Sequence, residues 1–298
     1  MRNSPLADRT VVVTGAARGV GAALAHEVAR RGARTALLGH ERHLLDELAG
    51  RLPAPALAVE TDVTDLRALR EAADEVRRRL GPPSVVVGNA GVAQGGPFAA
   101  TDPAEWRRVV DVNLTGSAQT ARTFLPDLRA TAGYYLQIAS LASLGAAPLM
   151  SAYCASKAGV EAFAHALRAE VACSGVAVGI AYLNWTDTDM IRDADRHAVL
   201  RELRGHMPAP ARRVRGDEEV AARIVRGMER RRTAVYAPGW LRLVQPVRAA
   251  LPPVVLRVSR RDLSRLEAEG SLAPTGLLGA GGHADDAARR RAPAPGRR

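Results

Sequence analysis

Tyr153 and Lys157 are the two side chains in this 298-residue sequence whose types and spacing best suit proton chemistry. They stand four positions apart in Tyr-Cys-Ala-Ser-Lys, which places both on one face of a helix. A phenol has a pKa of about 10, and a neighbouring ammonium favours the phenolate, so we expect the pKa of Tyr153 to be shifted towards neutrality. Such a phenol could give a proton to a carbonyl oxygen or take one from an alcohol.

Lys157 is also the only lysine in the chain, because the other 41 of the 42 basic residues are arginine. A guanidinium is planar, bulkier and differently hydrated, so the two cations are not interchangeable. We infer that position 157 requires an ammonium.

Two further polar residues precede this pair. Ser140 follows an apolar run at 133–139 and stands thirteen positions before Tyr153. A hydroxyl at that place could donate to a developing oxyanion. Ser143 is the alternative serine, but it lies beyond the end of the run. Asn113, in Val-Asn-Leu, lies within a long helical pattern.

A glycine-rich turn, TGAARGVG, follows the first apolar run at 10–14. Its glycines are Gly15, Gly19 and Gly21, and Val20 begins a helical pattern. Such a turn lets the backbone approach a pyrophosphate, which then sits at a helix N-terminus. Many strand–helix turns carry glycine for steric reasons only, so the turn alone is a modest indication.

The T-G-x-x-x-G-x-G turn, followed in order by the asparagine, the serine and Tyr-x-x-x-Lys, resembles the short-chain dehydrogenase/reductase family over about residues 8–240. The resemblance implies hydride transfer between a nicotinamide and a carbonyl or alcohol. It implies four catalytic residues. Tyr153 would exchange the proton, Ser140 would bind the substrate oxygen, Lys157 would lower the tyrosine pKa and bond the nicotinamide ribose, and Asn113 would hold a water in a proton relay.

The same resemblance implies the cofactor-binding residues. They would contact phosphates, adenine, the strand ends, the ribose and the carboxamide, and they are Gly15, Gly19, Val20, Gly21, Asp62, Val63, Asn89, Gly91, Tyr153, Lys157 and Thr188. Asn184 and Trp185 replace the family's usual Pro-Gly, which predicts a different local turn. Trp185 could face the pocket or serve plain packing.

The second strand pattern indicates which dinucleotide is bound. Gly39 stands where NAD-using members of the family carry an acid. Arg18, His40 and Arg42 could instead meet a 2′-phosphate, for which a guanidinium is well suited. We therefore favour NADP(H). NAD(H) is the alternative, with Glu41 as the acid on the ribose.

Short β-branched runs alternate with amphipathic stretches from residue 10 to about 236, which predicts βαβ units. We predict a Rossmann-type, doubly wound α/β fold with a mostly parallel seven-stranded sheet and helices on both faces. The expected strands are 10–14, 34–38, 56–61, 84–88, 133–139, 176–183 and 233–236, and the expected helices are 20–31, 41–51, 65–80, 102–129, 151–174 and 217–231.

The composition and pattern of the sequence divide the chain into three regions. Residues 1–240 would form the catalytic domain, with 186–215 as a substrate loop. Residues 241–269 form an amphipathic extension that could pack on the domain, contact another subunit or lie on a membrane surface. Residues 270–298 are rich in Gly, Ala, Pro and Arg, and we expect disorder there.

The net charge of +11 would suit nucleic acid or an anionic membrane, but arginine is used throughout as if by compositional bias, so we expect no nucleic-acid partner. Two cysteines make no disulfide framework, no secretory signal is visible, and a cytoplasmic location follows. The histidines show no metal-ligand spacing with carboxylates. A homodimer or homotetramer is what the resemblance implies.

The predicted function is an NADP(H)-dependent oxidoreductase acting on a fairly apolar ketone or aldehyde. The alternative is a catalytically silent nucleotide-sensing or scaffold protein on the same fold, against which the intact catalytic set argues. An epimerase or dehydratase on a related extended fold is a third alternative, but the chain after residue 190 leaves little room for its substrate domain.

Overall fold

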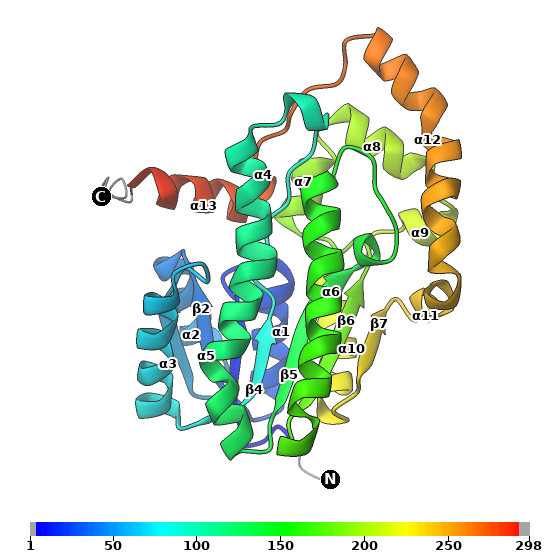
Figure 1. The fold of residues 1–298 in the computed structure, drawn as a ribbon. Helices are drawn as coiled ribbons and strands as arrows, with labels where there is room; N and C mark the ends of the chain where they lie inside the picture. The colour runs from blue at the N-terminus through cyan, green and yellow to red at the C-terminus, as the bar shows by residue number, and fades with distance from the viewer. Residues whose placement is uncertain (1–3, 292–298) are drawn as a thin grey trace.

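The structure, a computed structural model, describes residues 4–291. A seven-stranded sheet with the order β3-β2-β1-β4-β5-β6-β7 lies at its centre, and every neighbouring pair is parallel (Figure 1). The strands are β1 (Thr10–Thr14), β2 (Arg34–Gly39), β3 (Ala56–Glu60), β4 (Pro83–Gly88), β5 (Tyr134–Ser140), β6 (Ala177–Leu183) and β7 (Ala234–Ala237). The predicted Rossmann-type fold is confirmed.

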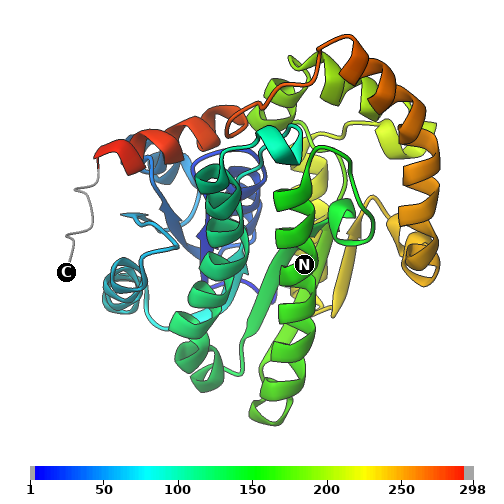
Figure 2. The same cartoon turned by 45° about the horizontal axis from the view of Figure 1, so that its top comes forward.

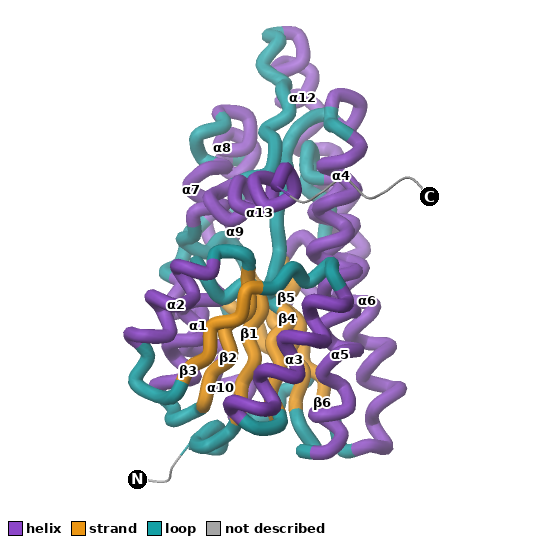
Figure 3. The backbone as a smooth tube through the Cα atoms, turned by 90° about the vertical axis from the view of Figure 1, so that its left-hand side faces the viewer, coloured by secondary structure: helices purple, strands orange, loops and turns teal. Residues whose placement is uncertain are grey.

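The side chains of successive strand residues pack alternately into two apolar cores, one on each face of the sheet. In β1, Val12 packs into one core, whereas Val11 and Val13 pack into the other. Because both faces are covered, each strand is a nearly continuous apolar run. One face carries α3 (Leu66–Leu80), α5 (Gly116–Ala130) and α6 (Ser151–Val171), and the other carries α1 (Gly19–Arg30), α2 (Arg42–Arg51) and α10 (Asp217–Glu229), as the edge-on view in Figure 3 shows.

The single helix predicted for 102–129 is interrupted. It consists of α4 (Pro103–Val110), a π-helical turn at Asp111–Thr115 and then α5. Such a turn inserts extra backbone into the helix and is often found at functional sites. Here it contains Asn113, which is fully buried. The average apolar period of the sequence does not reveal this local change.

The carboxyl ends of the strands are covered by the region after β6 (Figures 1 and 2). The connection predicted as a substrate loop holds three short helices, α7 (Asp189–Ala194), α8 (Ala198–Gly205) and α9 (Ala209–Arg212). The extension then forms α11 (Leu241–Val244) and the long α12 (Leu251–Ala268) at one side of the molecule. Within residues 4–291, no helix combines the length and the apolar character needed to cross a bilayer.

The predicted disorder of 270–298 is wrong for its described part. Residues Gly279–Arg291 form a helix, α13, which crosses above the strand ends (Figure 3). Leu277 and Leu278, just before it, are 4% and 1% exposed. Composition alone does not predict this helix, because a segment that packs on a surface already formed by the rest of the protein needs few apolar side chains of its own. The remaining positions, 292–298, lie outside the described residues.

Candidate active site

One cavity of about 780 Å³ lies at the carboxyl ends of the strands. The glycine turn lines one part of it, and Ser140, Tyr153 and Lys157 line the adjoining part. The residues singled out from the sequence that line it are Gly15, Arg18, Gly19, Val20, Gly21, Gly39, His40, Glu41, Val63, Asn89, Gly91, Ser140, Tyr153, Lys157, Asn184, Trp185 and Thr188. Segments far apart in the chain therefore meet in one space.

The glycine turn is packed so closely that side chains would not fit. Gly15 has φ +62°, and a Cβ added there would lie 2.8 Å from the Cα of Ala90. At Gly21 an added Cβ would lie 2.1 Å from the carbonyl oxygen of Gly15. Asn89 fixes the turn to the end of β4, because its Nδ2 donates to the Thr14 carbonyl at 2.8 Å. The turn therefore presents bare backbone to the cavity at the N-terminus of α1.

Tyr153 and Lys157 lie on α6 as their spacing predicts, and Nζ of Lys157 is 5.6 Å from the centre of the tyrosine ring. Burial raises the pKa of Tyr153 to about 12, partly opposed by a hydrogen bond with Ser140. Burial also lowers the pKa of Lys157 to about 8. The expected lowering of the tyrosine pKa is therefore wrong, because desolvation by burial raises this pKa and the hydrogen bond with Ser140 opposes the rise only in part. Tyr153 is set up to hold a proton and donate it.

Ser140 ends β5 and lines the cavity, with its Oγ accepting from the Ala142 amide at 3.2 Å. Ser143, the alternative serine, is 3% exposed, and its Oγ donates to the backbone carbonyl of Lys157 at 2.7 Å. Ser143 thus ties the loop after β5 to α6, whereas Ser140 is the hydroxyl that reaches the cavity.

Asn113 lies behind the cavity wall and does not line it. Its Oδ1 accepts from the Val92 amide at 2.8 Å, and its Nδ2 donates to the Val92 carbonyl and to Ser156 Oγ, both at 2.9 Å. A Cβ added to Gly91 would lie 3.2 Å from this Oδ1 and 3.5 Å from Nζ of Lys157. Asn113 therefore fixes the chain after β4 beside the lysine.

Arg18, at the mouth of the glycine turn, is already paired. Its Nε and Nη2 donate to the carboxylate of Glu41 at 2.8 and 2.7 Å, and Nη1 lies 3.5 Å from Asp189. Arg42 is not part of the cavity, because it pairs with Asp46 one turn further along the exposed face of α2. Of the three side chains predicted to bind a 2′-phosphate, Arg18 and His40 line the cavity and Arg42 does not.

Asp62 does not line the cavity and belongs to an ionic cluster beside it. Arg108 donates to Asp62 at 3.0 Å and makes two hydrogen bonds, at 2.8 and 2.5 Å, to Asp285 of α13. Nε2 of His40 lies 3.3 Å from the same carboxylate, which raises the pKa of the imidazole. Neither Arg108 nor Asp285 is identifiable from the sequence, because no local pattern links positions 177 residues apart.

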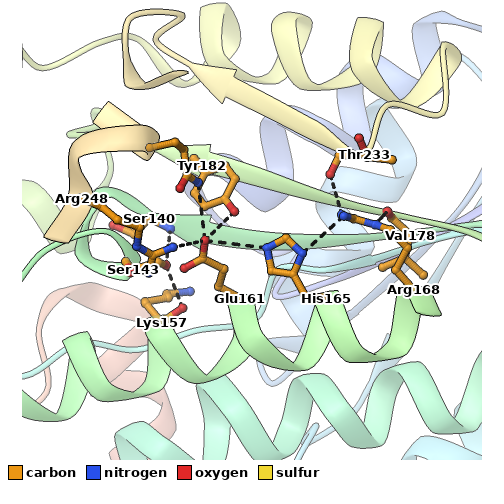
Figure 4. Close-up of polar contacts among 11 residues, drawn as sticks. Ser140, Ser143, Lys157, Glu161, His165, Arg168, Val178, Tyr182, Thr233 and Arg248 are labelled. Carbon is orange, nitrogen blue, oxygen red and sulfur yellow. Dashed lines mark hydrogen bonds and ion pairs between the residues drawn. The ribbon is translucent and has the colours of Figure 1, made fainter. Parts of the chain in front are cut away.

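A second buried acid, Glu161, lies one turn after Lys157 on α6 (Figure 4). Its side chain is 4% exposed and accepts from the Tyr182 hydroxyl at 2.7 Å and from Arg248 at 2.8 Å. Arg248 also donates to the Ser143 carbonyl at 2.8 Å. This network holds the C-terminal extension against the helix that carries the tyrosine and the lysine. No local sequence pattern predicts it, because Glu161 and Arg248 are 87 residues apart.

A family model described as short chain dehydrogenase matches residues 9–198. The chain belongs to the short-chain dehydrogenase family. It is 36% identical over 191 residues to glycine betaine reductase ATRR of Emericella nidulans, covering 63% of this chain and only 15% of that protein's length. It is 33% identical over 220 residues to acetoacetyl-CoA reductase of Synechocystis sp., covering 72% and 86% of the two chains.

A solved short-chain dehydrogenase/reductase from Burkholderia phymatum, in complex with NAD, superposes with a TM-score of 0.72. It is 25% identical and covers 82% of this chain and 94% of its own. The protein is thus an oxidoreductase of the short-chain dehydrogenase family, and part of its chain extends beyond that neighbour.

The remaining cavity wall of this short-chain dehydrogenase is largely apolar. Trp185 lines it, with the Arg204 guanidinium 5.4 Å from its ring centre, and Asn184 donates to the Ala211 carbonyl at 2.8 Å. The Asn-Trp pair therefore shapes the wall. The other apolar wall residues include Leu141, Pro148, Met150, Met190, Ile191, Leu200, Leu203, Met207, Pro210, Trp240, Val244, Leu251, Val254 and Val255.

Among residues 4–291, one group of three potential metal ligands comes within 4.8 Å of one another, namely Glu202, His206 and Asp262. His206 Nδ1 lies 2.9 Å from Asp262, and Arg265 pairs with Glu202. Because the guanidinium already neutralises Glu202, we interpret the group as an ion-pair cluster that fastens α12 to α8.

Proposed function

We propose that the protein is an NADP(H)-dependent reductase of a fairly apolar ketone or aldehyde. The observation that carries this proposal is that Ser140, Tyr153 and Lys157 line the same cavity as the glycine turn. A volume of about 780 Å³ is in the range of small-molecule and cofactor sites. A nicotinamide dinucleotide supplies or accepts a hydride when bound.

The residues present fit that group. Bare backbone at Gly15, Gly19 and Gly21, at the start of α1, suits a pyrophosphate. Thr188 packs against the turn, since a Cβ on Gly19 would lie 2.9 Å from its methyl group. Lys157, with Nζ 3.4 Å from the Ile138 carbonyl, lies where it could bond a ribose hydroxyl.

Within the reaction, Ser140 would bind the substrate oxygen and Tyr153 would donate its proton. A phenol with a pKa of about 12 keeps its proton at neutral pH, which favours the reductive direction. Lys157 would stabilise the phenolate left behind, because an ammonium attracts that charge. Asn113 would act through Lys157, as part of a proton path.

The preference for a 2′-phosphate rests on Arg18 and His40, together with the absence of an acid at Gly39. The pair between Arg18 and Glu41 favours a second candidate, an NAD(H) enzyme in which Glu41 binds the ribose. For NADP(H), the phosphate must displace Glu41 from the guanidinium. The variant Glu41→Gln separates the two.

The experiment is a titration of the purified protein with NADPH and with NADH, followed by nucleotide fluorescence. For the NADP(H) enzyme we expect Glu41→Gln to strengthen NADPH binding several-fold and Arg18→Ala to weaken it. For the NAD(H) enzyme, Glu41→Gln would instead weaken NADH binding. The variant Arg42→Ala is the matched control, because Arg42 lies outside the cavity.

Turnover is measured next with a panel of ketones and aldehydes, at the nicotinamide absorbance band. We expect Tyr153→Phe to abolish it while cofactor binding persists. Binding without turnover on any carbonyl would favour the silent nucleotide-sensing or scaffold protein. Peripheral membrane contact through 240–269 and a homodimer or homotetramer stay predictions, to be checked by vesicle cosedimentation and light scattering.

A further inference from the structure

The C-terminal segment 275–291 lies across the cofactor end of the cavity rather than leaving the protein. Its path is fixed by backbone pairing with the chain that follows β4. The Leu278 amide donates to the Ala93 carbonyl at 2.8 Å, and the Thr275 amide donates to the Gly95 carbonyl at 2.9 Å. The segment thus begins within a few residues of Asn89, which holds the glycine turn.

The start of α13 is docked on α7. Gly279 has φ +77°, and a Cβ there would lie 2.6 Å from backbone atoms of Met190, so only glycine fits. Its amide donates to the Asp193 carboxylate at 2.8 Å. The helix therefore starts against the segment that carries Thr188 and leads away from it towards the side of the sheet that holds β2 and β3 (Figure 2).

The middle of α13 is fastened by Asp285, whose side chain is 2% exposed. Its carboxylate accepts two hydrogen bonds from Arg108, which is itself 10% exposed, and lies 3.3 Å from His40. Paired charges this deeply buried are held in fixed geometry, since either one left alone would be strongly unfavourable. The contact joins α13 to the ends of β2 and β3 through His40 and Asp62.

The helix forms a wall of the cavity and does not fill it. Gly281, Gly282, Ala284 and Asp285 line the same space of about 780 Å³ as the glycine turn. Three of the four have no side chain or a single methyl group, which leaves the space open. A small-residue helix face over the cleft is what an enclosed ligand requires.

We propose that α13 is the outer wall of the adenosine half of the cofactor site and that Asp285 is its positioning residue, holding the wall closed and His40 in place. This inference rests on the proposed function. Cofactor exchange then requires α13 to move, so the Asp285 contact limits how fast the cofactor leaves.

The test is stopped-flow release of the reduced cofactor from Asp285→Ala and Asp285→Asn. We expect the dissociation rate constant and the KM for cofactor to rise at least tenfold, with kcat at saturating cofactor not falling. Asp286→Ala is the matched control, because Asp286 is 41% exposed and its ion pair within residues 4–291 is with Arg290 along the same helix. A merely structural loss would lower kcat and the melting temperature together.

Hydrogen exchange on the wild-type protein tests the wall without any substitution. We expect added cofactor to slow exchange in the amides of 281–290 as well as in those of 15–21. Protection of the glycine turn alone, unchanged release from Asp285→Ala, or tighter binding by that variant would overturn the inference while leaving the proposed function intact. Failure of the wild type to bind either dinucleotide would overturn both.

Discussion

We predict that the ammonium of Lys157 makes the folded protein less stable than it would be without that charge, and the variant Lys157→Met tests this prediction. The side chain is 5% exposed, and its hydrogen bond to the Ile138 carbonyl is long, at 3.4 Å. Burial lowers the pKa from 10.5 to about 8. At about 1.36 kcal/mol per pKa unit, the charged form costs the folded state about 3 kcal/mol.

The sign of the pH dependence follows from which state binds the proton more weakly. Below pH 8 both states carry the ammonium, and the whole cost is present. Between pH 8 and 10.5 the folded state loses its proton while the unfolded state keeps it, so wild-type stability rises. We therefore expect Lys157→Met to be more stable than wild type at pH 7, by up to about 3 kcal/mol, with the gap closing by about pH 10.5.

The assay is urea unfolding of both proteins at neutral and alkaline pH, with the slope m compared to check that both unfold to similar states. All other titrating groups are shared, so the difference between the two curves isolates Lys157. Lys157→Arg is the control, because it keeps the charge at both pH values and overpacks the site. A Met variant less stable than wild type at neutral pH, or a gap independent of pH, would refute the reasoning. The Met variant should also lose turnover.

Two other predictions concern the pH dependence of catalysis and the buried hydrogen bonds of Asn113. The kcat/KM for carbonyl reduction should fall as pH rises through about 8, where Lys157 loses its proton, since Tyr153 with a pKa of about 12 stays protonated. A profile flat to pH 10 would contradict the assignment of Lys157. Asn113→Ala removes the partner of the buried Val92 amide and should cost about 1–3 kcal/mol by urea unfolding. Turnover should fall as well, and an unchanged free energy of unfolding would contradict the buried-bond argument.

The fold and the centre of the site could be predicted because their determinants are local or ordered along the chain. Each strand is an apolar run followed by a helical period, and parallel sheets bring the carboxyl ends of such strands together. Tyr153 and Lys157 are four residues apart, and the glycine turn is one contiguous stretch. Such patterns survive without knowledge of tertiary contacts.

The pKa of Tyr153 and the pairing of Arg18 could not be predicted in this way. Both depend on how much water the folded protein removes and on which charge is nearest in space. The sequence correctly places Lys157 beside Tyr153, but it does not report how deeply both side chains are buried, and this burial raises the pKa of Tyr153 and lowers that of Lys157. It likewise contains Glu41 without indicating that both carboxylate oxygens bind Arg18.

The C-terminal segment shows why composition is a weak guide when a surface already exists. An isolated chain rich in Gly, Ala and Arg cannot bury enough apolar area to offset its conformational entropy. Here the chain after β4 and α7 supply the surface, and Leu277, Leu278 and one buried carboxylate, Asp285, fasten the segment to the rest of the protein. The same small residues that predicted disorder leave the cavity open beneath α13. A bulky, apolar segment would have been easier to recognise as folded, and it would have filled the space that a cofactor needs.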